Sequence, residues 1–264
     1  MSLSTQLAAQ LPYLRRYARA LTGSQFSGDR FVRATLEAAI ADLALKSSLV
    51  GGRVALYRAF TQLWSNAAGQ SVPTHQPAST RESAAQTALS SVTPLNRQAL
   101  LLTTLEEFSP AQAGEILDLP ADEIEALVAD AIAEIDREAA TSVLIIEDEP
   151  LISMQLEDLV TGLGHKVFGT AATRGQAQDA VADALPGLVL ADIQLADGSS
   201  GLDAVDDILS IADVPVIFIT AYPERLLTGD RPEPTYLVTK PFQERTVRTT
   251  ISQALFFRSN VTSG

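Results

Sequence analysis

Residues 188–198 read Leu188-Val189-Leu190-Ala191-Asp192-Ile193-Gln194-Leu195-Ala196-Asp197-Gly198 and carry the clearest structural signal in the sequence. Four apolar residues lead straight to a carboxylate, and a Gly-Ser-Ser-Gly loop follows. This pattern predicts a buried parallel strand that delivers Asp192 to the edge of a sheet. A carboxylate in that place can act as a nucleophile, as a metal ligand or as both. Taken alone, Asp192 could equally cap the next helix, so the choice between these roles depends on residues elsewhere in the chain.

The sequence around this stretch alternates between strand and helix patterns. The expected strands are Val143–Ile146, Lys166–Ala171, Leu188–Ala191, Val214–Thr220 and Tyr236–Thr239, and the expected helices are Pro150–Leu163, Arg174–Ala184, Gly201–Ile211, Tyr222–Thr228 and Gln243–Phe257. Strands and helices in strict alternation predict a doubly wound five-stranded parallel sheet. Ligands of such sheets bind beyond the carboxyl ends of the strands.

Polar side chains follow four of these strands. Glu147 and Asp148 come after the first strand, Asp192 after the third, Thr220 ends the fourth, and Lys240 follows the fifth. Clustered carboxylates repel one another unless a hard cation such as Mg²⁺ neutralises them. A lysine can stand beside an incoming phosphoryl group, and a threonine can donate a hydrogen bond to it. Each residue alone has a structural explanation, but together they predict that Asp192 is the nucleophile of a phosphoryl transfer.

Residues 142–260 resemble a two-component receiver domain. The matching stretches are IIEDEP, LADIQLADG, FITAY and TKPF. The resemblance implies that a histidine kinase phosphorylates Asp192. It also implies that Glu147, Asp148, Asp192 and the backbone carbonyl of Gln194 hold Mg²⁺.

Two positions depart from the receiver pattern. The acid pair is Glu-Asp where the family commonly has Asp-Asp, and Leu237 stands where the family has its switch aromatic. Tyr222, two residues after Thr220, is the expected replacement, so Thr220 and Tyr222 are the expected switch residues.

Composition limits the remaining possibilities. A chain of 264 residues is long for one core, so two compact domains are expected. The chain has no cysteine, which excludes disulfides and thiolate metal sites. It has no signal-peptide pattern and no apolar run near the roughly 20 residues of a membrane span. We therefore expect a soluble, cytoplasmic protein.

The first half of the chain reads as helical. Apolar spacing predicts helices over residues 3–21, 29–46 and 53–64, and a stretch without periodicity follows. Helical spacing returns after Pro94, and Ser109-Pro110-Ala111-Gln112 has the form of a capping box. A turn at residues 118–120 then leads to a helix whose expected buried positions are Ile124, Leu127, Val128, Ala131, Ile132 and Ile135. Two helices with such a turn form a helix-turn-helix pattern.

The helical half resembles regions two and four of an extracytoplasmic-function sigma factor. The matching stretches are YLRRYARALTG at residues 13–23 and LNRQALLL at residues 95–102. We expect a region-two-like domain over residues 1–64, a linker over 65–84, a region-four-like domain over 85–140 and the receiver over 141–264. The fold class is therefore an all-α half joined to an α/β half.

Charge argues against DNA binding. The net charge is −13, and residues 105–140 carry eleven acidic residues against one basic residue. The second helix of the helix-turn-helix offers Asp122, Glu123, Glu125, Asp130, Glu134 and Asp136, with no lysine or arginine before Arg137. Phosphate neutralisation supplies most nonspecific affinity for DNA, so DNA should repel this helix. The arginines of residues 15–33 (Arg15, Arg16, Arg19, Arg30 and Arg33) are interpreted as a solvated helix face.

A sigma-like half, a receiver that follows it and an acidic recognition helix together resemble the PhyR family of general stress regulators. The resemblance implies that phosphorylation frees the sigma-like half from its receiver. That half then captures a NepR-like anti-sigma factor and releases the stress sigma factor. The resemblance also implies that the protein is not an enzyme, apart from a receiver that catalyses its own phosphoryl transfer and dephosphorylation. Three alternatives stay open: a DNA-binding response regulator, a sigma factor controlled in cis, and a receiver that serves as a phosphate sink.

Overall fold

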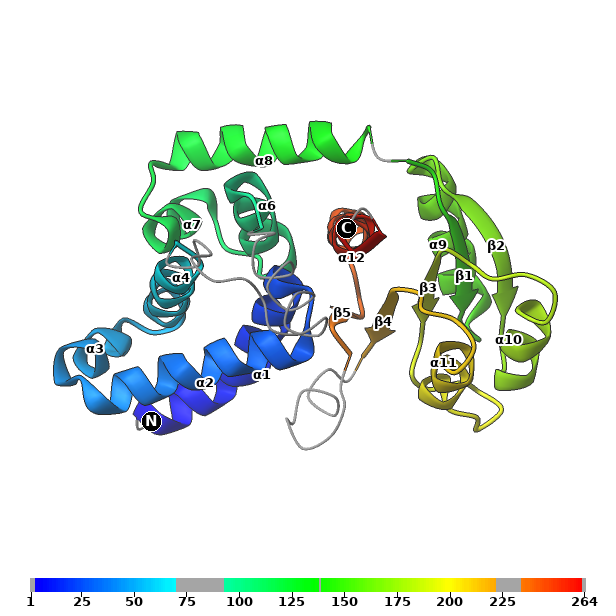
Figure 1. Cartoon of the computed structure of the whole chain (residues 1–264), viewed down its shortest axis with the longest axis horizontal. Coiled ribbons are helices and arrows are strands. Elements are labelled where there is room, and N and C mark those ends of the chain that lie inside the picture. The colour runs from blue at the N-terminus through cyan, green and yellow to red at the C-terminus, as the bar shows by residue number, and fades with distance from the viewer. Residues whose placement is uncertain (1–2, 70–92, 138, 222–233, 263–264) are drawn as a thin grey trace, which may run out of the picture. The chain divides into compact units, whose positions relative to one another are not determined.

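The computed structural model describes residues 3–69, 93–137, 139–221 and 234–262. These residues form two compact units (Figure 1). The first unit contains residues 3–69, 93–133 and 256–262, and the second contains residues 134–137, 139–221 and 234–255. No helix in these ranges is long and apolar enough to cross a membrane.

The first unit is helical. Its elements are α1 (Leu3–Thr22), α2 (Gln25–Ala41), α3 (Leu43–Ser48), the short helical turn η1 (Leu49–Gly51), α4 (Arg53–Gly69), α6 (Leu95–Leu100), the π-helical segment η2 (Leu101–Leu105), α7 (Pro110–Leu117) and α8 (Ala121–Ile135). The core contains Tyr17 of α1 and Tyr57 and Phe60 of α4, all fully buried. The Tyr17 ring lies 5.4 Å from the Tyr57 ring and 5.8 Å from the Phe60 ring, in tilted and edge-on arrangements that aromatic pairs favour.

Two helix boundaries differ from the sequence prediction. The helix predicted over residues 29–46 breaks at Asp42, whose backbone is extended and whose side chain accepts hydrogen bonds from the N–H groups of Ala44 and Leu45. Asp42 thus ends α2 and caps α3, as a side-chain oxygen at this position does. Ile40 and Leu43, the apolar residues on either side of this break, are 79% and 77% exposed. In addition, α4 continues to Gly69, into the expected linker.

The helix-turn-helix forms as predicted. Ser109 accepts a hydrogen bond from the Gln112 N–H, and the Gln112 side chain accepts one from the Ser109 N–H. Asp118 takes the left-handed conformation that ends α7. The stripe on α8 is narrower than predicted, because only Ile124 and Ala131 are buried. Residues seven apart lie on the same line of a helix, so α8 contacts the core along one narrow edge.

The second unit contains the predicted sheet. Its elements are β1 (Ser142–Ile146), α9 (Pro150–Gly162), β2 (Lys166–Ala171), α10 (Arg174–Ala180), β3 (Leu188–Ala191), α11 (Gly201–Leu209), β4 (Val216–Thr220), β5 (Tyr236–Thr239) and residues 244–255 of α12 (Glu244–Thr262). All strands are parallel, in the order β2-β1-β3-β4-β5. The helix predicted from Tyr222 lies outside the described residues.

The strand order locates the functional edge. The order reverses between β1 and β3, because the chain moves outward to β2 and then returns past β1. Right-handed crossovers place the helices before and after such a reversal on opposite faces of the sheet. The carboxyl ends of β1 and β3 therefore border the crevice where this kind of sheet binds ligands.

Candidate functional site

Asp192 stands one residue beyond the end of β3. Ala191 pairs with Ile146 of β1, and the Asp192 N–H donates to the Ile146 carbonyl at 2.8 Å. This register brings Asp192 beside Glu147, the first residue after β1. The four residues of β3 are all buried, which explains why the sequence shows an uninterrupted apolar run there.

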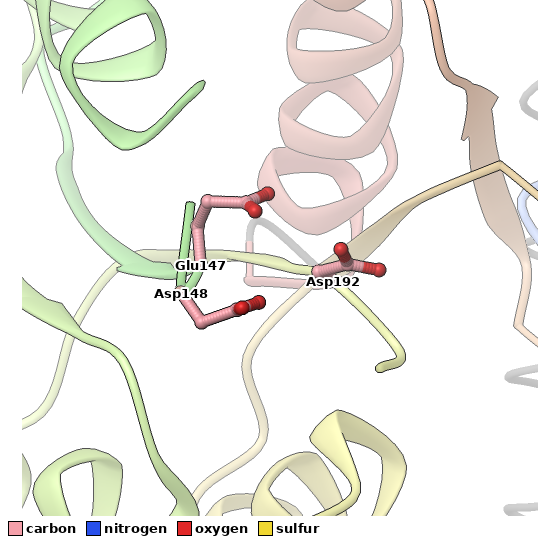
Figure 2. Close-up of side chains that lie close together, drawn as sticks. All are labelled: Glu147, Asp148 and Asp192. Atoms are coloured by element: carbon pink, nitrogen blue, oxygen red, sulfur yellow. The ribbon is translucent and has the colours of Figure 1, made fainter. Parts of the chain in front are cut away.

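Three carboxylates meet at this edge (Figure 2). Oxygen atoms of Glu147, Asp148 and Asp192 all lie within 4.8 Å of one another. Glu147 is 3% exposed and Asp192 is 9% exposed. Burial raises the pKa of Glu147, and the hydrogen bond from Lys240 opposes that rise. A cluster of oxygen ligands of this kind suits a hard divalent cation such as Mg²⁺.

Lys240 supplies the positive charge of the site. Its Nζ lies 2.6 Å from Oδ2 of Asp192 and 3.0 Å and 2.8 Å from the two carboxylate oxygens of Glu147. Burial alone would lower the pKa of Lys240, but the hydrogen bonds to Asp192 and Glu147 outweigh it and raise the pKa. Lys240 is therefore a charged ammonium that touches the predicted nucleophile directly.

The remaining predicted site residues are placed as follows. Thr220 is 2% exposed at the end of β4, and its carbonyl accepts a hydrogen bond from the Lys240 N–H at 2.7 Å. Leu237 is buried in β5, in register with Phe218. The Gln194 N–H donates to Oδ1 of Asp192 at 3.3 Å. Tyr222 lies outside the described residues. The roles of the Thr220 hydroxyl, the Gln194 carbonyl and Tyr222 stay predictions.

Gly201 is a site residue that the sequence interpretation missed. A methyl group at this position would overlap the backbone carbonyl oxygen of Asp192. The Gly201 N–H also donates to the Ile193 carbonyl at 2.9 Å. The first residue of α11 thus packs directly against the backbone of Asp192. The Gly-Ser-Ser-Gly loop was the only sequence signal for this contact.

Two of the arginines assigned to a solvated face are buried. Arg16 is 6% exposed and Arg19 is fully buried. Arg19 makes a two-pronged ion pair with Asp29 at 2.9 Å and 2.7 Å. Arg16 pairs at 2.9 Å with Glu106, whose side chain is fully buried. The solvated-face interpretation is therefore wrong for these two residues, because both side chains are buried and each is paired with a carboxylate.

Glu106 joins three parts of the helical unit. It also pairs with Arg53 at 2.8 Å and accepts a hydrogen bond from the Tyr57 hydroxyl at 2.7 Å. Its partners come from α1 and α4, whereas Glu106 itself follows η2. These contacts tie α1 and α4 to the segment that leads into the helix-turn-helix.

The acidic residues of the second helix-turn-helix helix face solvent. Its exposed carboxylates are Asp122, Glu123, Glu125, Asp130 and Glu134, and Asp136 follows just beyond its end. The helix itself carries no basic residue. The surface that would enter the major groove in a DNA-binding relative is therefore negatively charged.

Comparison with known proteins agrees with both halves of the structure. Residues 7–61 match the model for the sigma2 domain of PhyR, residues 89–138 match the sigma-like domain of the response regulator PhyR, and residues 143–252 match the response regulator receiver domain. The chain is 51% identical over 261 residues to the phyllosphere-induced regulator PhyR of Methylorubrum extorquens, covering 98% of this chain and 97% of that protein. The chain belongs to the PhyR family.

Solved structures of PhyR proteins match nearly the full length of this chain. The response regulator PhyR from Brucella abortus has a TM-score of 0.86 and 48% identity, covering 99% of this chain and 97% of that one. The anti-anti-sigma factor PhyR from Bartonella quintana has a TM-score of 0.86 and 49% identity, covering 99% of both chains. PhyR from Bartonella quintana has also been crystallised with the anti-sigma factor NepR. The family accounts for the order of the domains, in which the receiver follows the sigma-like half.

Proposed function

We propose that this protein is an anti-anti-sigma factor that phosphorylation of Asp192 activates. In this proposal a histidine kinase in the cytoplasm phosphorylates Asp192, the sigma-like half is released from the receiver, and it sequesters a NepR-like anti-sigma factor. The stress sigma factor is thereby freed. The observation that carries the proposal is the direct contact of the Lys240 ammonium with Asp192 inside a cluster of three carboxylates.

Phosphoryl transfer to Asp192 requires only a few groups. An oxygen of Asp192 attacks the phosphorus of a phosphohistidine, a P–O bond forms, the P–N bond breaks, and the imidazole leaves with the bond's electrons and takes up a proton. Lys240 already touches the attacking carboxylate, so its ammonium stabilises negative charge on the transferred group. The Thr220 hydroxyl would donate a hydrogen bond to a phosphoryl oxygen. Mg²⁺ held by Glu147, Asp148, Asp192 and the Gln194 carbonyl would offset further phosphoryl charge when bound.

In this proposal, the regulatory effect of phosphorylation comes from the negative charge that it adds. A phosphoryl group brings about −1.5 to −2 at neutral pH, which can bias a two-state contact such as that between the receiver and the sigma-like half. Thr220 and Tyr222 are the proposed switch residues that respond to it. The exposed carboxylates of α8 support a protein partner over DNA, because phosphates would be repelled by them.

A phosphodonor experiment separates this proposal from its alternatives. The full-length chain is incubated with acetyl phosphate and Mg²⁺, and then mixed with a NepR-type anti-sigma factor or with promoter DNA. We expect phosphodonor-dependent binding of the anti-sigma factor and no shift of the DNA. A DNA shift without anti-sigma binding would favour a DNA-binding regulator, and promoter opening with core polymerase would favour a sigma factor controlled in cis. Rapid phosphate loss with neither form of binding would favour a phosphate sink.

A further inference from the structure

The loop after Asp192 is closed by backbone hydrogen bonds. Gln194 and Ser200 form an isolated antiparallel bridge, and the Leu195 N–H donates to the Ser199 carbonyl at 3.3 Å. The loop therefore leaves the strand end, turns and returns alongside Gln194 before α11 begins.

This closure fixes one peptide group in particular. The carbonyl of Gln194 and the N–H of Leu195 belong to the same planar trans peptide, so they point in opposite directions. Because the Leu195 N–H is directed at Ser199, the direction of the Gln194 carbonyl is set by the position of Ser199. That carbonyl is the backbone ligand expected for the divalent cation.

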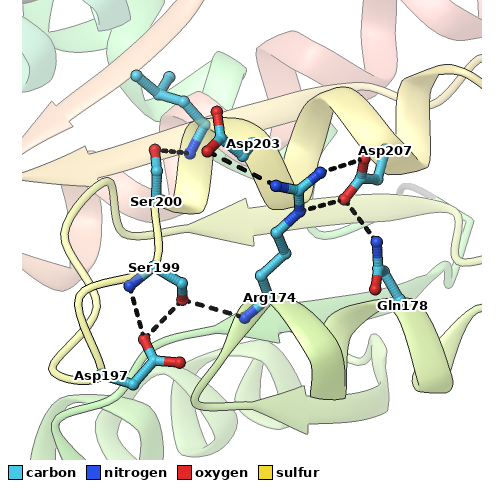
Figure 3. A network of polar contacts seen from close by, with 8 residues as sticks. Arg174, Gln178, Asp197, Ser199, Ser200, Asp203 and Asp207 are labelled. Carbon is cyan, nitrogen blue, oxygen red and sulfur yellow. Dashed lines mark hydrogen bonds and ion pairs between the residues drawn. The ribbon is translucent and has the colours of Figure 1, made fainter.

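Ser199 is itself held from two sides (Figure 3). Its N–H donates to Oδ1 of Asp197 at 2.9 Å, and its hydroxyl donates to the same oxygen at 2.6 Å. The Ser199 hydroxyl also accepts a hydrogen bond from the backbone N–H of Arg174 at 3.3 Å. The loop is thus tied to the first residue of α10, which comes from a different crossover.

Arg174 is anchored in turn to α11. Its guanidinium makes a two-pronged ion pair with Asp207 at 2.5 Å and 2.8 Å, and it lies 3.7 Å from Asp203. Gln178 donates a further hydrogen bond to Asp207 at 2.8 Å. Arg174 and Asp207 are partly exposed, but a two-pronged arginine–carboxylate pair holds a defined geometry (Figure 3). The start of α10 is therefore held against α11, beside the loop.

From these contacts we propose that Asp197, Ser199 and Arg174 are positioning residues that orient the Gln194 carbonyl toward a divalent cation at the acid cluster. The proposal rests on the proposed function only in that it takes the acid cluster to bind Mg²⁺. None of the three residues touches the reacting atoms. They act through the Gln194–Leu195 peptide, in the way that outer groups orient the direct ligands of a metal.

The test measures Mg²⁺ affinity in the unphosphorylated full-length chain, by titration with MgCl₂ followed through the amide NMR signal of Leu195. Ser199→Ala removes both side-chain contacts and is expected to raise the Mg²⁺ dissociation constant about tenfold, at the low end of the range for outer-shell changes. Ser199→Thr keeps the hydroxyl and should restore most of the affinity. Thr161→Ala removes an exposed hydroxyl of α9 that bonds only within its own helix, and should leave the affinity unchanged.

A second pair of variants separates positioning from charge. Asp197→Asn removes the negative charge but keeps an oxygen that can accept both hydrogen bonds from Ser199. Asp197→Ala removes the charge and also the oxygen that accepts these hydrogen bonds. We expect Asp197→Ala to weaken Mg²⁺ binding several-fold more than Asp197→Asn. Equal effects of the two variants, or wild-type affinity in a folded Ser199→Ala protein, would overturn the proposal. A wild-type chain that binds Mg²⁺ but takes no phosphate would contradict the proposed function and leave this inference standing.

Discussion

At the scale of the residue, Asp192 is set apart by its neighbours. It is nearly buried among two other acidic residues, and Lys240 lies within hydrogen-bonding distance of both Asp192 and Glu147. Buried like charges are costly unless they are compensated, so the Lys240 ammonium offsets the repulsion within this cluster, and the proposed divalent cation would offset it further when bound. Glu147 stands where receivers commonly have aspartate, and both of its carboxylate oxygens lie close to the Lys240 ammonium, at 3.0 Å and 2.8 Å. Glu147, the residue that differs from the common Asp-Asp pair, therefore takes part in the charge balance of the site.

Gly201→Ala tests how closely the backbone must support Asp192. Alanine should gain about 1 kcal/mol of helix propensity, but overlap with the Asp192 carbonyl should cost about 1–3 kcal/mol. We therefore expect a modest net loss of stability together with phosphorylation that is roughly tenfold to a hundredfold slower, because small displacements of reacting groups are expensive. Phosphate incorporation from acetyl phosphate measures the rate.

Gly162→Ala is the matched control for this prediction. A methyl group there, at the end of α9, would meet no atom within 4 Å. This variant should be phosphorylated at the wild-type rate. A Gly201→Ala protein that is phosphorylated equally fast would show that the close packing behind Asp192 is not needed for the reaction.

At the scale of the element, the receiver half was predictable and the helical half only partly so. Strands β1, β3 and β4 are largely apolar runs buried on both faces, and the polar residues of the site follow strand ends, which lie along one edge of a parallel sheet. In the helical half, periodicity over residues 29–46 could not reveal that Asp42 would cap a new helix. Nor could it reveal that Arg16 pairs with a carboxylate 90 residues away. Such pairings depend on tertiary contacts that a local pattern does not contain.

Glu106→Ala should loosen the helical unit. The change removes the carboxylate shared by Arg16, Arg53 and Tyr57, and it leaves the buried Arg16 charge without its acidic partner. Breaking a buried pair in this way costs about 3–5 kcal/mol. Because Arg16 keeps its hydrogen bond to the Leu105 carbonyl, we expect a loss near the lower figure, about 3 kcal/mol.

Urea unfolding followed by the fluorescence of Trp64 measures this loss. Trp64 is the only tryptophan of the chain and is buried in α4, so its signal reports on the helical unit. Arg58→Ala is the control, because its pair with Asp118 is exposed and should contribute less than about 1 kcal/mol. A loss for Glu106→Ala as small as that for Arg58→Ala would contradict a linking role for Glu106.

In the molecule as a whole, acidic residues gather in two places that have different roles: the helix-turn-helix and the acid cluster of the receiver. Residues 105–140 carry a net charge of −10, and the carboxylates of α8 face solvent. A helix-turn-helix with this surface keeps the shape of a DNA-binding module without the charge that DNA requires. The receiver, with its own acid cluster, supplies a site where added phosphate changes the charge of the protein. Together these features are those of a phosphate-controlled partner switch.

We expect phosphate on Asp192 to control binding of the anti-sigma factor. The measurement is the affinity of the full-length chain for a NepR-type anti-sigma factor, with and without acetyl phosphate and Mg²⁺, in the wild type, in Asp192→Ala and in Asp183→Ala, which removes an exposed receiver carboxylate. We expect at least a tenfold gain in affinity on phosphodonor addition for the wild type and Asp183→Ala, corresponding to about 1.4 kcal/mol or more, and none for Asp192→Ala. A full gain in the Asp192→Ala protein would show that phosphate on Asp192 does not control this binding.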